Sequence, residues 1–226
     1  MTTLYTTYLE RAIAQHGSLA AVEDRLPSSL AAEELAAIPD RQYLSEMAAC
    51  VFRAGFVWRV ISLKWPGFEA VFNGFLPIWV ASRSPEEIEA MASDKRIVRN
   101  LTKVKSVQDN ALFVLDIQRE HGSFGKFLAS WPSDDITGLW AYLKKHGSRL
   151  GGNSGQYFLR FSGKDTFILS RDVCTALLST GIIDKAQVTA QRDLKKVQAA
   201  FNEMQQESGR SMAELSMILA LSIGPR

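Results

Sequence analysis

The stretch with the clearest potential for chemistry is a glycine-rich turn over residues 147–155. It reads Gly-Ser-Arg-Leu-Gly-Gly-Asn-Ser-Gly and separates a helical pattern over 136–146 from another that resumes at Gln156. Glycines let the chain turn with positive φ and let phosphate oxygens approach backbone amides closely. Amides at the start of the second helix then point at a phosphate, helped by the helix dipole. The pattern predicts contact with a nucleic-acid backbone, although the same turn also serves as a plain helix connection.

The distribution of charge favours the same class of partner. The net charge is only +2, but residues 1–46 hold seven acidic and three basic side chains, so the remainder is basic. Residues 94–105 contain five Lys or Arg against one acid, and residues 144–171 contain six against one. This asymmetry suits a polyanion bound on one face, while solvated helix surfaces produce clusters of this size as well.

Several classes of site are excluded by the small number of cysteines and histidines. Two cysteines, Cys50 and Cys174, and three histidines rule out a disulfide scaffold, a zinc finger and a Cys/His metal cluster. We therefore expect no metal and no cofactor. No apolar run approaches the roughly 20 residues that span a bilayer, and the N-terminus lacks the pattern of a signal peptide. The expectation is a cytoplasmic protein without membrane contact.

Helical patterns dominate the elements that must position the turn. An apolar content of 46% in 226 residues is enough for a core, and strand patterns are few apart from Thr-Phe-Ile-Leu within 163–169. Ser84-Pro85-Glu86-Glu87 is a typical helix start. The sequence predicts an all-α fold with its main helices over residues 4–15, 30–37, 41–63, 68–75, 85–93, 99–120, 124–129, 136–146, 156–161, 171–180, 189–208 and 211–222.

The order of features around the turn resembles the helix-hairpin-helix superfamily of DNA glycosylases. Leu150–Gly155 stands in the place of the hairpin, and Leu169–Val173 stands in the place of the catalytic loop. The resemblance implies a two-lobed helical domain that flips a base out of DNA and holds it between the lobes. It also implies a set of residues that contact the DNA backbone, namely Gly151, Gly152, Asn153, Ser154, Gly155, Lys103, Lys105 and Arg149.

A second stretch, residues 46–115, resembles the 3-methyladenine DNA glycosylase I branch. The matching pieces follow in order without large gaps: Ala54-Gly55-Phe56-Val57-Trp58, Phe68–Phe72, Asp94–Arg99 and Asn110-Ala111. The resemblance implies a monofunctional DNA glycosylase of base excision repair, which hydrolyses the N-glycosidic bond of an alkylated base in double-stranded DNA and works as a monomer.

The chain departs from this branch at its metal site and at its acidic position. The branch carries zinc on Cys and His near both termini, whereas this chain has no Cys before Cys50 and no His after His146. Counting back from Trp58, the glutamate with which the branch contacts the base falls on Cys50. Glu46 lies one turn earlier on the same helical face, so we expect Glu46 to take that role, with Cys50 packed as a small side chain at the base.

A further departure concerns the aspartate that most of the superfamily uses on the sugar. Ser170 occupies that position, and Asp172 follows two residues later, so both are candidates for catalysis. The alternative is that Ser170 is a helix N-cap and Asp172 a favourable charge in the first turn. The resemblance implies less need for the aspartate in this branch, because a cationic base is already an activated leaving group. Gln156-Tyr157 replace the lysine of bifunctional members, so no lyase activity is expected.

Aromatic side chains supply the expected base-binding surface. A flipped cationic base is held by stacking and cation–π contact, and Trp58 is the first candidate, with Phe52, Trp65 and Tyr43 behind it. The alternative for each is an ordinary place in the core.

Three interpretations of function stay open at this stage. One is the glycosylase, and another is a non-catalytic relative that binds damaged or distorted DNA, which a Trp58 pocket without a carboxylate favours. The third is an unrelated helical interaction protein, which requires the basic residues to be scattered rather than gathered on one face. In each case we expect one domain over residues 1–226. It comprises an acidic helical extension over 1–40, a core over 41–184 with the hairpin near 147–156, and C-terminal helices over 185–226.

Overall fold

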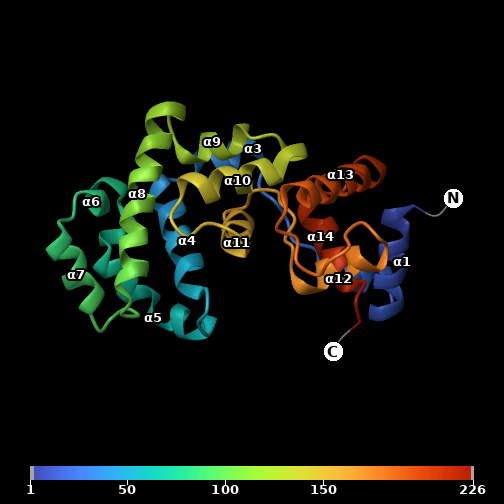
Figure 1. The fold of residues 1–226 in the computed structure, drawn as a ribbon, viewed down its shortest axis with the longest axis horizontal. Coiled ribbons are helices and arrows are strands. Elements are labelled where there is room, and N and C mark those ends of the chain that lie inside the picture. Colours follow the sequence, from blue (N-terminus) through green and yellow to red (C-terminus); the bar gives the residue numbers. More distant parts are fainter. Residues whose placement is uncertain (1–2, 225–226) are drawn as a thin grey trace. The chain divides into compact units, whose positions relative to one another are not determined.

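The computed structural model describes residues 3–224, and every regular element in that range is helical (Figure 1). The all-α prediction is therefore confirmed. No helix within the described residues has the length and apolar character needed to cross a membrane. The elements in chain order are α1 (Leu4–His16), α2 (Leu19–Glu23), α3 (Ala32–Ala37), α4 (Asp40–Arg53), α5 (Trp58–Val71), η1 (Asn73–Phe75), α6 (Pro77–Ala81), α7 (Pro85–Ser93), α8 (Leu101–His121), α9 (Phe124–Ser130), η2 (Ser133–Asp135), α10 (Ile136–His146), α11 (Asn153–Phe161), α12 (Arg171–Ser179), α13 (Gln191–Ser208) and α14 (Met212–Leu221).

The chain folds into two compact units. The first contains the chain up to Leu30, Pro132–Leu139 and the chain from Gly163 onward; the second contains Ala31–Trp131 and Trp140–Ser162. Each unit therefore combines segments that are distant in sequence, and each has its own buried side chains.

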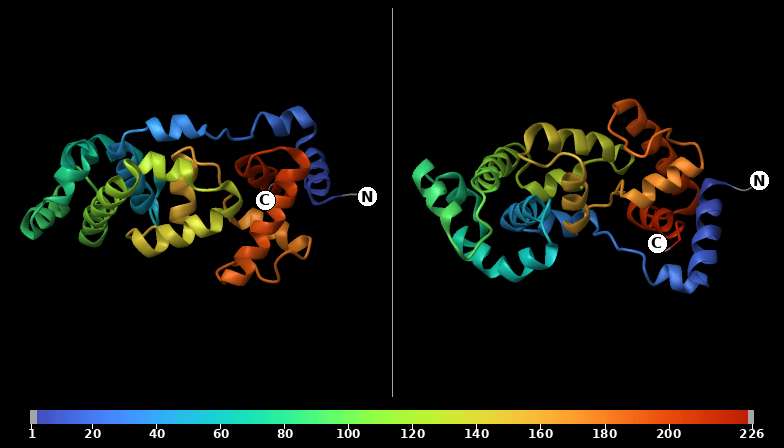
Figure 2. Two further views of the ribbon diagram at one scale, coloured as in Figure 1. Left: turned by 90° about the horizontal axis from the view of Figure 1, so that it is seen from above. Right: turned by 60° about the horizontal axis from the view of Figure 1, so that its bottom comes forward.

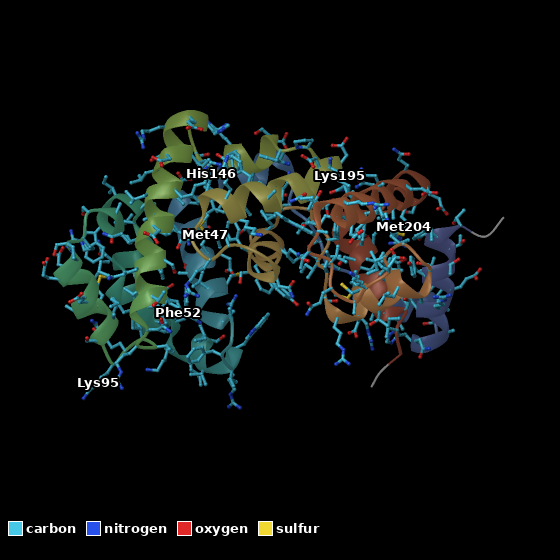
Figure 3. All side chains as sticks on the ribbon, viewed as in Figure 1. Met47, Phe52, Lys95, His146, Lys195 and Met204 are labelled. Carbon is cyan, nitrogen blue, oxygen red and sulfur yellow. The ribbon has the colours of Figure 1, made fainter. Side chains whose placement is uncertain are left out.

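In the first unit the C-terminal helices cover the N-terminal segment. α1 packs on α14 and α13, which Figure 2 shows in blue beside red. The Tyr8 hydroxyl lies 2.6 Å from the Thr180 hydroxyl, and Phe167 stacks on Phe201 with ring centroids 4.1 Å apart. Met204 of α13 is fully buried in the same core (Figure 3). The acidic N-terminal segment thus completes a core with residues near the other end of the chain.

The extended segment before α12 is tied to α14 by one carboxylate. Asp165 accepts hydrogen bonds from the backbone amides of Met212 (3.0 Å) and Ala213 (2.9 Å), and from the Ser29 hydroxyl (3.1 Å). A negative charge is most favourable at a helix N-terminus, where free amides and the dipole coincide. The strand-like residues that follow form no ladder; Ile168 instead donates its amide to the Ser216 hydroxyl at 3.0 Å.

The second unit is organised around α8, the longest helix, which contacts α4, α6, α7 and α9. Met47 and Phe52 project from α4 into this core (Figure 3). Phe52 meets Phe68 edge to face at 4.6 Å, and Trp65 stacks on both Phe68 and Phe75. These aromatic contacts fix α5 and η1 against α4.

Three predicted helix boundaries are wrong. The single helix expected over 41–63 is two helices, because the chain leaves α4 at Ala54 and turns at Gly55 with φ +74°. Pro66 lies inside α5 rather than ending it, since aromatic packing on both sides outweighs the loss of one amide donor. α11 begins at Asn153, earlier than the Gln156 start expected, because Gly152 already supplies the helix cap.

We predict that Asp165→Ala lowers the free energy of unfolding by about 2–4 kcal/mol, because it leaves two amides and a hydroxyl without their charged acceptor. Urea denaturation measures the change. Asp184→Ala removes a carboxylate whose side chain is largely exposed and serves as the control, with an expected change within about 0.5 kcal/mol. Equal effects of the two variants would contradict the capping role.

Candidate functional site

A cavity of about 450 Å³ lies in the second unit, between the end of α4 and the start of α11. One side is formed by the turn that joins α4 to α5, and the other by side chains of α11. The lining residues are Cys50, Arg53, Ala54, Gly55, Phe56, Val57, Trp58, Asn153, Ser154, Tyr157 and Phe161.

Most of the cavity lining is apolar, and three of its aromatic rings contact one another. Trp58 is 46% exposed and meets the edges of Tyr157 and Phe161 at centroid distances of 5.7 and 6.0 Å. Tyr157 and Phe161 stack on each other at 5.6 Å. Trp58 is nearly perpendicular to the other two rings, so the three form a corner in which another planar ring can stack on an exposed ring face.

The polar part of the wall is a guanidinium held by a carboxylate. Arg53 donates from Nη1 to Glu46 Oε1 at 2.9 Å, and the Cys50 thiol lies 3.6 Å from the same oxygen. The Arg53 guanidinium lies 5.4 Å from the Phe161 ring centroid and 5.7 Å from that of Trp58. Its charge therefore borders the aromatic surface.

Burial shifts the pKa values of Glu46 and Cys50. Burial raises the pKa of the Glu46 carboxyl, while the charge of Arg53 acts in the opposite direction. Burial, and then the neighbouring carboxylate, raise the pKa of the Cys50 thiol, which keeps the thiol protonated as a donor to Glu46. Among the described residues that line the cavity there is no carboxylate. Glu46 reaches the cavity only through Arg53 and Cys50.

The hairpin between α10 and α11 is built from constrained backbone. Arg149 and Gly152 have φ of +61° and +58°, and a Cβ on Gly155 would stand 2.3 Å from the Leu150 carbonyl oxygen. Gly152 provides no side-chain cap, so the first amides of α11 are open to an external acceptor. These amides lie at Asn153 and Ser154, which also line the cavity.

α8 holds the hairpin in place through one amide side chain. Asn110 is fully buried; it donates to the Ser148 carbonyl at 3.1 Å and accepts from the Ser148 amide at 2.7 Å. The Ser148 hydroxyl donates to Asp109 at 3.0 Å. The paired bonds fix the hairpin relative to the helix core.

Two of the expected base-stacking residues belong to the core instead. Tyr43 is buried and donates its hydroxyl to the Leu35 carbonyl at 2.7 Å, and Phe52 is fully buried against Phe68. Neither lines the cavity: Tyr43 packs on Phe124 at a centroid distance of 5.3 Å, and Phe52 points to the opposite side of α4, toward Phe68. Trp65 also lies outside the cavity, because it stacks on Phe68 and Phe75. Trp58 and Cys50, by contrast, do line it.

Lys103 also differs from the expectation. It is 6% exposed, and its ammonium donates to the carbonyls of Phe52 (3.2 Å) and Ala54 (2.7 Å) while lying 4.7 Å from the Phe56 ring centroid. Burial, with a contribution from the charge of Arg149, lowers the pKa of this ammonium. Lys103 therefore binds backbone carbonyls at the end of α4 and is not available to a phosphate. Lys105 and Arg149, by contrast, are exposed.

Ser170 and Asp172 lie in the first unit, at the start of α12. The Ser170 hydroxyl accepts from the Val173 amide at 3.2 Å, and Asp172 occupies the first turn. This is the arrangement of the capping alternative. Within residues 3–224 no group of three or more His, Cys, Asp or Glu side chains is placed to hold a metal ion.

Arg53, Tyr157 and Phe161 line the cavity but were not among the site residues predicted from the sequence. Helical spacing could have indicated all three: Arg53 lies seven residues after Glu46, and Tyr157 and Phe161 are four apart, so each pair shares one helix face. Which faces meet across the cavity was not readable from spacing.

The comparisons with known proteins agree with this fold. The model of the methyladenine glycosylase family matches residues 36–148. The chain belongs to the methyladenine glycosylase family. DNA-3-methyladenine glycosylase 1 of Escherichia coli (strain K12) is 28% identical over 79 residues, which is 35% of this chain and 42% of that protein. The match thus spans less than half the length of this curated relative.

Solved structures support the same fold. A variant of 3-methyladenine DNA glycosylase I from Staphylococcus aureus aligns with a TM-score of 0.51 and 24% identity, over 64% of this chain and 84% of its own. The 8-oxoguanine glycosylase/lyase of Methanocaldococcus jannaschii, solved with a 15mer DNA, aligns with a TM-score of 0.55 and 13% identity, over 93% of this chain and 94% of its own. The fold is that of the helix-hairpin-helix DNA glycosylases.

We predict that Lys103→Met lowers the free energy of unfolding by about 1–3 kcal/mol, because two backbone carbonyls at the end of α4 lose their donor. Lys105→Met, on the exposed side of α8, is the matched control with an expected change within about 0.5 kcal/mol. Urea denaturation compares the two. A Lys103 variant as stable as the control would show that the ammonium does not support the end of α4.

Proposed function

We propose that this chain is a monofunctional DNA glycosylase that excises an alkylated base, 3-methyladenine or a close analogue, from double-stranded DNA in base excision repair. The observation that carries the proposal is the juxtaposition of two features on α11. Its first turn lines an aromatic cavity with Trp58, and the same turn carries the open amides of the hairpin. Family membership supports the same activity.

The chemistry follows from this arrangement. Extruding a base costs a few kcal/mol, least for a damaged base, and stacking on Trp58, Tyr157 and Phe161 offsets that cost. Water then attacks C1′ of the sugar, the glycosidic electron pair leaves with the base, and an abasic site remains. No lysine lines the cavity among the described residues, and the guanidinium of Arg53 stays protonated and is not a nucleophile, which agrees with hydrolysis rather than lyase chemistry.

We assign the contacts with the DNA backbone to the hairpin and to nearby basic side chains. The amides from Asn153 to Gly155 suit a phosphate, and Arg149 and Lys105 supply exposed positive charge in the same unit. A cytoplasmic location and a monomeric state are part of the proposal, because double-stranded DNA is the substrate and one chain contains both the cavity and the hairpin.

A second candidate function is a non-catalytic protein that recognises damaged DNA. One observation favours it: the described lining of the cavity lacks a carboxylate, since Glu46 is engaged by Arg53. In this case the cavity binds an extruded base without cleaving it.

We predict that purified protein releases 3-methyladenine from methylated duplex DNA and that Trp58→Ala slows release about tenfold to hundredfold, since stacking contributes about 1–3 kcal/mol per base. Glu46→Gln reduces release as well, because it weakens the charge that holds Arg53. Chromatography of released bases gives the rates. Trp79→Ala, a tryptophan on α6 outside the cavity, is the control with unchanged release.

Two negative results have different meanings. DNA binding that remains sensitive to salt, without release of any base, favours the non-catalytic function. Absence of both binding and release contradicts both functions.

We predict that Arg149→Ala and Lys105→Ala each reduce the slope of log binding constant against log salt concentration by about one, because each removes one phosphate contact. Fluorescence anisotropy over a salt series with undamaged duplex measures the slope. Lys126→Ala, an exposed lysine on α9, is the control with an unchanged slope. Equal slopes for all four proteins would place the phosphates elsewhere.

A further inference from the structure

Among the described lining residues the charged side chain is that of Arg53, whose action on the base the proposed function leaves unspecified. Arg53 lines the cavity beside Trp58 and Phe161, and its side chain is 24% exposed. Glu46, which is 26% exposed, pairs with the guanidinium at 2.9 Å and is not among the lining residues. The charged side chain that an incoming base meets in the described lining is therefore positive.

A positive charge in the cavity lining is unexpected for a site that only holds a cationic base. A carboxylate in the wall would attract such a base and stabilise it before reaction. A guanidinium repels it, and Arg53 already occupies the cation–π positions of both rings. The positive wall therefore favours another stage of the reaction.

Bond cleavage changes the charge of the base by one unit in a fixed direction. The electron pair of the C1′–N bond moves onto the base, so a cationic alkylated base leaves neutral and an uncharged one leaves as an anion. Water forms the new bond to C1′ and gives up a proton to solvent. A fixed positive charge beside the base is more favourable after this transfer than before it, which is the condition for lowering the barrier.

We propose that Arg53 acts on the departing base, with Glu46 as the residue that positions its guanidinium. This inference rests on the proposed function and deepens it. A cationic alkylated base leaves easily because its own positive charge stabilises the departing electron pair. The guanidinium of Arg53 supplies part of this stabilisation from outside the base. The substrates accordingly include uncharged alkylated bases with a ring nitrogen or carbonyl that accepts a hydrogen bond.

The first test measures binding without catalysis. Uncharged 3-methyladenine and the permanently charged 3,9-dimethyladeninium ion have similar shapes. The guanidinium of Arg53 repels the cation and can donate a hydrogen bond to the uncharged base. We expect wild-type protein to bind the uncharged base about tenfold more tightly, Arg53→Lys to keep this preference, and Arg53→Met to lose it. Isothermal titration calorimetry gives both affinities. Equal affinities in the wild-type protein overturn the proposal.

The second test separates affinity from rate on a duplex that contains one lesion. We expect Arg53→Met to slow single-turnover release about tenfold while binding a cationic lesion as well as or better than wild type. Arg53→Lys retains most of the rate, and guanidinium ion added to Arg53→Ala restores part of it. A parallel loss of affinity, rate and melting temperature in Arg53→Met, together with no rescue, shows a structural role only and overturns the proposal.

The two tests also separate this inference from the function on which it rests. Selective binding of the uncharged base without release from any lesion contradicts the glycosylase and keeps the electrostatic assignment of Arg53. Release of a base without selectivity between the two ligands keeps the glycosylase and contradicts the role of Arg53.

Discussion

The end of α4 depends on a buried ammonium group. Lys103 of α8 donates to the last carbonyls of α4, so the helix stops at Arg53 and the chain turns through Gly55 to Trp58. An ammonium at a helix C-terminus satisfies free carbonyls and matches the negative end of the dipole. Gly55 supplies the positive φ of the turn, and the Lys103 ammonium binds carbonyls that the end of the helix leaves free. The cavity therefore depends on a helix end that is fixed jointly by its own glycine and by a neighbouring helix.

The polar wall of the cavity follows from spacing on α4. Glu46 and Cys50 are four residues apart, and Arg53 completes the face. A glutamate at position 50 would set two carboxylates against each other at helical spacing and at partial burial, which is unfavourable. With Cys50, the thiol donates to Glu46 and the carboxylate is left to hold Arg53. The departure from the 3-methyladenine glycosylase I pattern at position 50 and the presence of Glu46 are thus physically coupled.

The hairpin is placed by a single buried amide rather than by its glycines alone. Gly152 and Gly155 permit the turn, but the two hydrogen bonds between Asn110 and Ser148, one donated and one accepted by Asn110, decide where the turn lies relative to α8. α8 therefore supports both sides of the candidate site, with Lys103 behind the α4–α5 turn and Asn110 behind the hairpin. Buried polar groups with all their partners present make such an arrangement specific, since any shift leaves one of them unsatisfied.

The sequence by itself determined the helical class, most helix ends and the hairpin, because these depend on neighbours within one or two turns. Ser84, Ser123 and Ser170 cap their helices through their own side chains, and Gly17 and Gly209 end theirs with positive φ. Trp58 was found through the family pattern and does line the cavity. Tertiary structure alone decided that Lys103 is buried, that Tyr43 and Phe52 are core, and that Arg53 borders the aromatic rings. Periodicity assigns a residue to a face of its helix, but which element covers that face depends on contacts between residues that are far apart in the chain.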